Sequence, residues 1–350
     1  MLIYFPGGTV DMTAHEVLEG NRLKELHRAM GNDCGGNKVN ENFLNFLSEF
    51  LGKDDFERFS IEHKDDYVEL LDDFESKKRY HDPEKLKRTT LRIPTNLGKL
   101  LTKKLGHNRS GAFEIIANDK MRLTTEFVTT LFMGVIKYIV QSITEMLVSI
   151  PDSIEQLLVV GGFADSPMLR QELRKAFESE MKVTFPYEGS LAVLKGAVLF
   201  GHNPATVTER KSRYTYGLAM VVSFDKEKHP KSKAIFIDDK RLCNDVFDIH
   251  VRVGDTVRYG EYQTERVYFP MSDTDTTYPI VLYRSTKREP KFVDEEECEA
   301  VGYYLAQRPF NKGTCTRNEQ VKVKLAFGNA DIKVVVIAQD GTTETPAFKF

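Results

Sequence analysis

Residues 156–167 read Gln-Leu-Leu-Val-Val-Gly-Gly-Phe-Ala-Asp-Ser-Pro, and this stretch decides the fold. The run Gln156 to Val160 is short and apolar, which is typical of a buried strand in a parallel sheet. Gly161-Gly162 follows directly, and glycine reaches positive φ without strain. Ser166-Pro167 then matches a helix N-cap followed by proline at the first helical position. We therefore predict a strand, a tight glycine turn and a helix that ends near Phe177.

The hydrophobic pattern on either side of this stretch indicates an α/β domain. Residues 124–149 carry a wide apolar stripe at helical spacing, with Thr124 as the N-cap and Pro151 just beyond the end. Three strands open the chain and helices then alternate with strands, which favours a mixed sheet covered by helices. The expected strands are 2–5, 9–18, 22–30 and 183–185, and the other expected helices are 39–51, 64–79 and 191–200.

The composition and the hydrophobic pattern of the sequence change near Asn203. Residues 203–213 are polar and charged, and segments with a period of two follow them. Val321, Val323 and Leu325 alternate with lysines, and Asp340-Gly341 is a hairpin signal. We predict a first domain at 1–203, a linker at 204–213 and a smaller, mainly antiparallel β domain at 214–350. Its expected strands are 214–224, 250–259, 280–283, 321–327 and 332–336.

The composition excludes several functional classes. The 350-residue chain is 41% hydrophobic and 29% charged, with a net charge of -3, so no basic face for nucleic acid is expected. No run of about 18 apolar residues is found, and residues 1–12 lack a basic leader, so we expect neither a membrane span nor a signal peptide. The scattered cysteines disfavour a zinc site and suit a reducing compartment, which favours the cytoplasm. They are Cys34, Cys243, Cys298 and Cys315.

Glycine pairs mark three turns of the first domain. They are Gly7-Gly8 on a hairpin tip, Gly35-Gly36 in the next loop and Gly161-Gly162 between strand and helix. Backbone N–H groups at such turns can converge on phosphate oxygens, and a helix N-terminus favours an anion. The alternative is that these glycines only make turns. Three pairs at strand ends of one α/β domain favour phosphate binding.

Charged residues beside these turns extend the candidate site. Thr9 and Asp11 are two residues apart on a strand and point to the same side, where a carboxylate can hold a magnesium-bound water. The alternative for Asp11 is an ordinary exposed aspartate. Glu75, Lys78 and Arg79 share one helix face by their spacing, and on its own that spacing favours a solvated, salt-bridged face.

Taken together, these residues resemble the Hsp70 family. The second phosphate motif, Asp-x-Gly-Gly-Gly-Thr-x-Asp, is similar to residues 4–11, and the loop Leu-Gly-Gly-x-x-x-Asp is similar to residues 34–40. The Glu-x-x-Lys-Arg of the adenine-side helix matches Glu75, Lys78 and Arg79. The adenosine motif resembles residues 158–167, and the hinge motif resembles residues 192–197. Details such as Gly-Gly-Phe-Ala-Asp-Ser-Pro and Tyr-Thr-Tyr-Gly at 214–217 resemble the divergent heat shock 70 kDa protein 12 branch.

The resemblance implies an actin/Hsp70-like, ribonuclease H-like lobe that binds ATP or ADP with Mg²⁺. Thr9 and Asp11 would be catalytic, and Asp11 would hold the metal through water. The implied ATP-binding residues are Gly7, Gly8, Gly35, Gly36, Glu75, Lys78, Arg79, Gly161 and Gly162. No Asp-x-Gly-Thr loop is found, so the resemblance implies lobe II without lobe I. The domain at 214–350 would contact a client or partner, as in a chaperone.

Several positions depart from the family pattern. Tyr4 and Pro6 replace an aspartate and a glycine, and proline removes an N–H that should reach phosphate. Asn40 replaces an aspartate, and Asp165 stands where an arginine covers adenine in ordinary Hsp70 proteins. These departures keep two alternatives open: a degenerate interaction protein without hydrolysis, and a sugar kinase or actin relative. The glycine junction and the trailing β domain argue against the latter.

Overall fold

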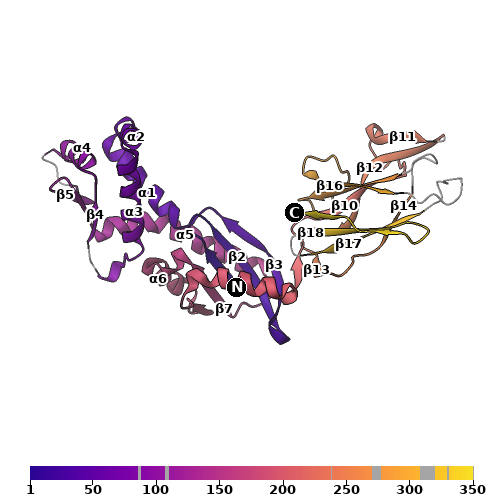
Figure 1. The fold of residues 1–350 in the computed structure, drawn as a ribbon, viewed down its shortest axis with the longest axis horizontal. Coiled ribbons are helices and arrows are strands. Elements are labelled where there is room, and N and C mark those ends of the chain that lie inside the picture. The colour runs from indigo at the N-terminus through magenta and orange to yellow at the C-terminus, as the bar shows by residue number, and fades with distance from the viewer. Residues whose placement is uncertain are drawn as a thin grey trace. The chain divides into compact units, whose positions relative to one another are not determined.

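The computed structural model describes residues 1–85, 88–106, 110–237, 239–269, 277–307, 320–328 and 331–349. Cys315, one of the four cysteines of the sequence, lies outside the described residues. The chain divides into two compact units, one made of Met1–Ala14 with Ala29–His202 and the other of His15–Arg28 with Asn203–Phe350. Figure 1 labels their elements.

A mixed sheet forms the centre of the first unit. It is made by five neighbouring strands of a seven-stranded sheet, in the order β3-β2-β1-β7-β8. Strand β1 pairs antiparallel with β2 and parallel with β7, which in turn runs parallel to β8. The α/β class with a mixed sheet is therefore confirmed. The bounds are β1 Leu2–Phe5, β2 Val10–Leu18, β3 Arg22–Asn32, β7 Gln156–Gly161 and β8 Lys182–Thr184.

Seven helices and a small second sheet complete the described part of this unit. The helices are α1 Gly36–Leu51, α2 Lys53–Glu62, α3 Lys64–Lys78, α4 Thr95–Leu105, α5 Thr125–Ser149, α6 Pro167–Phe177 and α7 Ala192–His202. Strands β4 Thr89–Arg92, β5 Phe113–Ile116 and β6 Lys120–Leu123 form a sheet in the order β4-β6-β5. Figure 1 shows this sheet close to α3 and α4. The sequence pattern missed α2, α4, β4 and β6.

Helix α5 follows its sequence pattern closely. The Thr124 hydroxyl accepts a hydrogen bond from the Phe127 N–H at 3.3 Å, as expected of an N-cap. By length and composition alone α5 could also cross a membrane, although Lys137 and Glu145 interrupt its apolar run. Buried core helices meet the same criterion, and here the apolar stripe of Val128, Phe132 and Ile139 is buried in the unit.

The glycine turn at 156–177 is confirmed. Strand β7 ends at Gly161, a short 3-10 turn spans Gly162–Asp165, and α6 begins at Pro167. Gly161 has a φ of 100°, and a Cβ there would lie 2.2 Å from the Phe5 carbonyl oxygen. Glycine is required because the backbones of β1 and β7 meet at this point.

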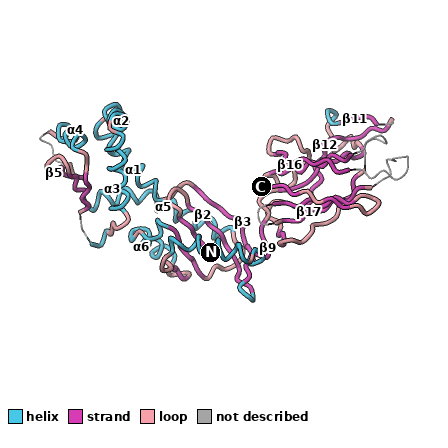
Figure 2. The backbone as a smooth tube through the Cα atoms, viewed as in Figure 1, coloured by secondary structure: helices cyan, strands magenta, loops and turns pink. Residues whose placement is uncertain are grey.

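Strands dominate the second unit, as the magenta tube in Figure 2 shows. One sheet has the order β11-β12-β10-β15-β16, and another joins β14, β17, β18 and β19, with β20 paired to β18. Their buried faces share one hydrophobic core that includes Leu218, Leu282, Val323 and Val334. The bounds are β10 Thr215–Ser223, β11 Ala234–Ile237, β12 Lys240–Val251, β14 Arg266–Tyr268, β15 Thr277–Ser285, β16 Cys298–Gln307, β17 Val321–Phe327, β18 Asp331–Ile337, β19 Thr343–Glu344 and β20 Ala347–Lys349.

Two expectations near the boundary need correction. The stretch 204–213, expected as a linker, contains strand β9 (Val207–Lys211), which pairs with the start of β3 and with β13 (Thr256–Arg258). The strand expected at 250–259 is interrupted, because β12 ends at Val251 and a turn with Gly254 at φ 85° precedes β13. The expected alternation in β17 is confirmed, since Val321, Val323 and Leu325 are buried.

A Gly161→Ala substitution tests the close approach of β1 and β7. The methyl group would collide with the Phe5 carbonyl, and the φ of 100° disfavours any side chain. Backbone strain and overpacking each cost about 1–3 kcal/mol, so we expect unfolding free energy to fall by at least about 2 kcal/mol. Urea denaturation measures this. Gly162→Ala is the matched control, because no heavy atom lies within 4 Å of its added Cβ. Equal stability of the two variants would contradict the packing argument.

Candidate functional site

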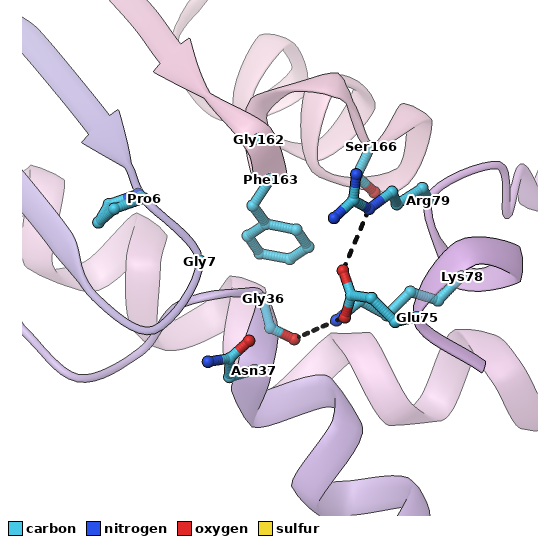
Figure 3. A pocket seen from close by; sticks show the side chains of 10 residues that line it. All are labelled: Pro6, Gly7, Gly36, Asn37, Glu75, Lys78, Arg79, Gly162, Phe163 and Ser166. Atoms are coloured by element: carbon cyan, nitrogen blue, oxygen red, sulfur yellow. Dashed lines mark hydrogen bonds and ion pairs between the residues drawn. The ribbon is translucent and has the colours of Figure 1, made fainter. Parts of the chain in front are cut away.

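A pocket in the first unit gathers residues from four separate parts of the chain. Pro6 and Gly7 follow β1, Gly36 and Asn37 begin α1, and the end of α3 supplies three charged residues. The turn between β7 and α6 closes the pocket with Gly162, Phe163 and Ser166 (Figure 3). Of the residues predicted to bind ATP, those that line the pocket are Gly7, Gly36, Glu75, Lys78, Arg79 and Gly162.

Lys78 anchors α3 to α1. Its side chain is only 2% exposed, and its ammonium group donates to the Gly36 carbonyl at 2.6 Å and to Asn40 Oδ1 at 2.7 Å. It also lies 2.5 Å from Glu75 Oε2, which accepts a hydrogen bond from the Asn40 amide at 2.8 Å. An ammonium has three protons, so these acceptors satisfy it fully. A solvated helix face is therefore the wrong description of Lys78.

Burial sets the electrostatics of this pair. Desolvation lowers the pKa of Lys78 below its ordinary value, and the nearby Glu75 carboxylate offsets only part of that effect. Burial also opposes ionisation of Glu75, but hydrogen bonds from Lys78 and Asn40 outweigh it and hold the pKa of Glu75 below its usual range. Each group of the pair favours the charged form of the other. Asn40 contributes as a donor to Glu75 and an acceptor for Lys78, which an aspartate could not do.

Arg79 is the exposed member of the charged set. Its side chain is 57% exposed, and its Nε donates to Glu75 Oε1 at 3.1 Å. The planar guanidinium lines the pocket, as Figure 3 shows. A guanidinium in this position can stack on a planar ligand.

The glycine loops hold one another together. The Gly35 N–H donates to the Gly8 carbonyl at 3.0 Å, and the Asn37 N–H donates to the Gly7 carbonyl at 2.9 Å. A Cβ on Gly35 would lie 2.3 Å from the Gly7 oxygen, so glycine is needed for this approach. Gly8, Gly35 and Gly161 do not line the pocket. The N–H groups of Gly35 and Asn37 therefore support the loops and are not free to bind phosphate.

Asp11 lies on β2, and Thr9 comes just before this strand begins at Val10, one residue later than expected. The Thr9 hydroxyl donates to Asp11 Oδ2 at 3.2 Å, and both residues are exposed. Neither lines the pocket. Within the described ranges, no group of three or more His, Cys, Asp or Glu residues is arranged to hold a metal ion.

Sequence reasoning missed Phe163 and Ser166 as pocket residues. Phe163 is 6% exposed and packs edge-on against Phe5, with ring centroids 5.9 Å apart. Ser166 was expected as a helix cap and as part of the adenosine motif, and its side chain makes no capping bond. Asp165, at the family's arginine position, pairs with Arg170 at 2.7 Å and does not line the pocket.

Comparison with known proteins finds similar sequences in heat shock 70 kDa proteins 12A and 12B. The chain is 29% identical over 343 residues to heat shock 70 kDa protein 12A of Homo sapiens, which covers 95% of this chain and 50% of that protein. Heat shock 70 kDa protein 12A of Mus musculus is also 29% identical over 343 residues. The similarity supports the heat shock 70 kDa protein 12 branch of the Hsp70 family.

A second relative of this branch gives the same result. Heat shock 70 kDa protein 12B of Homo sapiens is 29% identical over 349 residues, with 95% of this chain and 51% of that protein covered. The chain thus spans about half the length of these curated relatives. No family model matches the sequence. The heat shock 70 kDa protein 12 similarity fits the actin/Hsp70-like fold of the mixed α/β unit.

Two neighbouring cations of this pocket should differ in their contribution to stability. Lys78→Met removes a buried ammonium and leaves Glu75 and the Gly36 carbonyl without this hydrogen-bond donor. Breaking a buried pair costs about 3–5 kcal/mol, and we expect the lower end because the Glu75 side chain is 30% exposed. Arg79→Met breaks an exposed pair and should cost less than about 1 kcal/mol. Urea denaturation of both variants checks this, and a Lys78 variant as stable as the Arg79 variant would refute the anchoring role.

Proposed function

We propose that this Hsp70-like protein binds an adenine nucleotide in the pocket between the β1–β2 turn, the start of α1, the end of α3 and the β7–α6 turn. One observation carries the proposal. Six residues that the sequence nominated for ATP binding, from segments far apart in the chain, line one pocket. Chance exposure of unrelated glycines and charged residues does not explain this convergence.

The pocket suggests how the nucleotide would be oriented. The charged end of α3, with Glu75 and Arg79, is suited to the polar edges of a nucleoside. Gly7 and Gly36 lie on the side of the β1–β2 turn, which leads to Thr9 and Asp11. Phosphates would extend in that direction, with Mg²⁺ held by phosphate oxygens, water and Asp11.

We also propose that the β-rich part of the chain, 214–350, contacts a client or partner protein. Nucleotide occupancy would shift its affinity by stabilising one of two states, which requires the nucleotide to bind those states unequally. Support for this role is positional, because the β domain follows the α/β domain as in Hsp70 proteins. We place the protein in the cytoplasm, in keeping with the free thiols of Cys34, Cys243 and Cys298.

A degenerate interaction protein is the second candidate. Pro6 has no N–H to offer, and the Gly35 and Asn37 N–H groups are already bonded to the β1–β2 turn. Lys78 is also fully engaged by protein acceptors. These existing hydrogen bonds favour a site that binds nucleotide without hydrolysing it, or a site that no longer binds nucleotide.

Titration with a fluorescent ADP analogue separates the two candidates. We expect saturable binding to the 350-residue chain, and Arg79→Met should weaken it about tenfold, since a stacked guanidinium contributes about 0.5–2 kcal/mol. Lys77→Met is the matched control, because Lys77 is a neighbouring exposed cation that pairs with Asp73 and does not line the pocket. Absence of binding to the wild-type chain would favour the degenerate protein.

Hydrolysis by this chain should be negligible. Phosphoryl transfer needs positioned charge around the γ-phosphate, and each missing preorganised group costs about 10²–10³ in rate. Pro6 and the two bonded N–H groups remove several such donors. We expect phosphate release with Mg²⁺ and ATP to match that of an Asp11→Ala variant. Turnover typical of an intact Hsp70 that Asp11→Ala abolishes would show the phosphate side to be complete.

A further inference from the structure

The hydroxyl of Ser166 is a buried polar group without a partner. Ser166 is 2% exposed, and its Oγ makes no hydrogen bond to any residue that the structure describes. Its backbone is satisfied, because the N–H donates to the Phe163 carbonyl at 3.0 Å and the carbonyl accepts from the Arg170 N–H at 3.0 Å. Burying an unpaired hydroxyl is unfavourable, and such groups in folded proteins usually have a reason.

Two structural roles for this hydroxyl fail. Ser166 is the N-cap of α6, but no side-chain capping bond is made, and Pro167 at the next position has no N–H to donate. Nor does the neighbouring Asp165 bond it, because that carboxylate pairs with Arg170. The remaining direction is the pocket, which Ser166 lines together with Glu75, Arg79 and Phe163 (Figure 3).

We infer that Ser166 is a ligand-contacting residue that hydrogen-bonds the base of the bound nucleotide, with the ring stacked near Phe163. This inference rests on the proposed nucleotide site. Ser166 shares the pocket with the α3 side chains, whereas Thr9 and Asp11, which would face phosphate, do not line it. The base is therefore the part of the ligand within reach of Ser166.

Access to the hydroxyl requires a side chain to move. The cavity volume is ≈ 50 Å³, which is small for a nucleobase, and the Oγ is screened from solvent. Arg79 is the lining side chain best able to move, because it is 57% exposed and, among the described residues, its side chain is tied only to Glu75, through Nε. Its displacement would open the pocket and let the guanidinium cover the inserted ring.

Ser166→Ala in the 350-residue chain tests the assignment. Loss of one hydrogen bond should weaken ADP and adenosine by the same factor, about three- to tenfold, and leave ribose 5-phosphate unchanged. Competition against a fluorescent ADP analogue measures all three. The unfolding temperature without ligand should stay the same or rise, because an unpaired buried hydroxyl is removed.

Ser142→Ala is the control for a buried serine with a structural role. The Ser142 hydroxyl donates to the Tyr138 carbonyl at 3.0 Å and accepts from the Asn32 amide at 3.1 Å. This variant should lose stability and keep its ADP affinity. Wild-type affinity in Ser166→Ala, an equal loss for ribose 5-phosphate, or a loss of stability like that of Ser142→Ala would each overturn the inference alone. A wild-type chain that binds no ADP would overturn the proposed function and this inference together.

Discussion

The contact between the Phe5 carbonyl and the backbone of Gly161 is the constraint on which the first unit depends. Parallel pairing places Phe5 opposite Gly161, and no side chain fits between the two strands at that point. A second close approach follows, because Gly35 lies directly against the carbonyl of Gly7. These two contacts bring the ends of β1, β3 and β7 together. The segments that line the pocket are therefore held in place by backbone contacts that only glycine permits.

The buried ammonium of Lys78 fixes the opposite wall. Burying a charge is costly, and here three acceptors from two helices compensate for it. The consequence is that α3 is held at one position relative to Gly36, so Arg79 and Glu75 are presented to the pocket. The same bonds limit the ability of Lys78 to bind a ligand, because a ligand oxygen would have to replace one of these protein acceptors. Binding must rely more on groups that have spare capacity, such as the outer nitrogens of Arg79.

Local signals in the sequence predicted the elements that carry the site. The β7 strand, its glycine turn and α6 depend on short-range rules for glycine, proline and apolar runs, and so does the N-cap of α5. Non-local contacts explain the failures. Strand β9 is polar and forms only because β3 and β13 offer partners. The 250–259 segment alternates as a strand should, yet the turn at Gly254 divides it.

The roles of individual site residues were harder to predict than their presence. Gly35 and Gly161 were nominated as phosphate donors, but the structure uses them for close backbone approach. Ser166 carried a clear capping signal, and only the packed structure reveals that its hydroxyl bonds no backbone N–H. A sequence pattern identifies which atoms are available. Which partner each atom takes is decided by packing across segments that lie far apart in the chain.

The hydrogen bonds already made within the glycine loops also affect how a nucleotide could control the second unit. A ligand shifts a conformational equilibrium only as far as it binds the two states unequally. The N–H groups of Gly35 and Asn37 already bond the β1–β2 turn. The γ-phosphate would therefore add few contacts, and ATP and ADP would differ little in affinity. Control would then come from whether the pocket is occupied, because hydrolysis would leave most of the contacts to the nucleoside in place. Such a protein would respond to nucleotide concentration and not to a cycle of turnover.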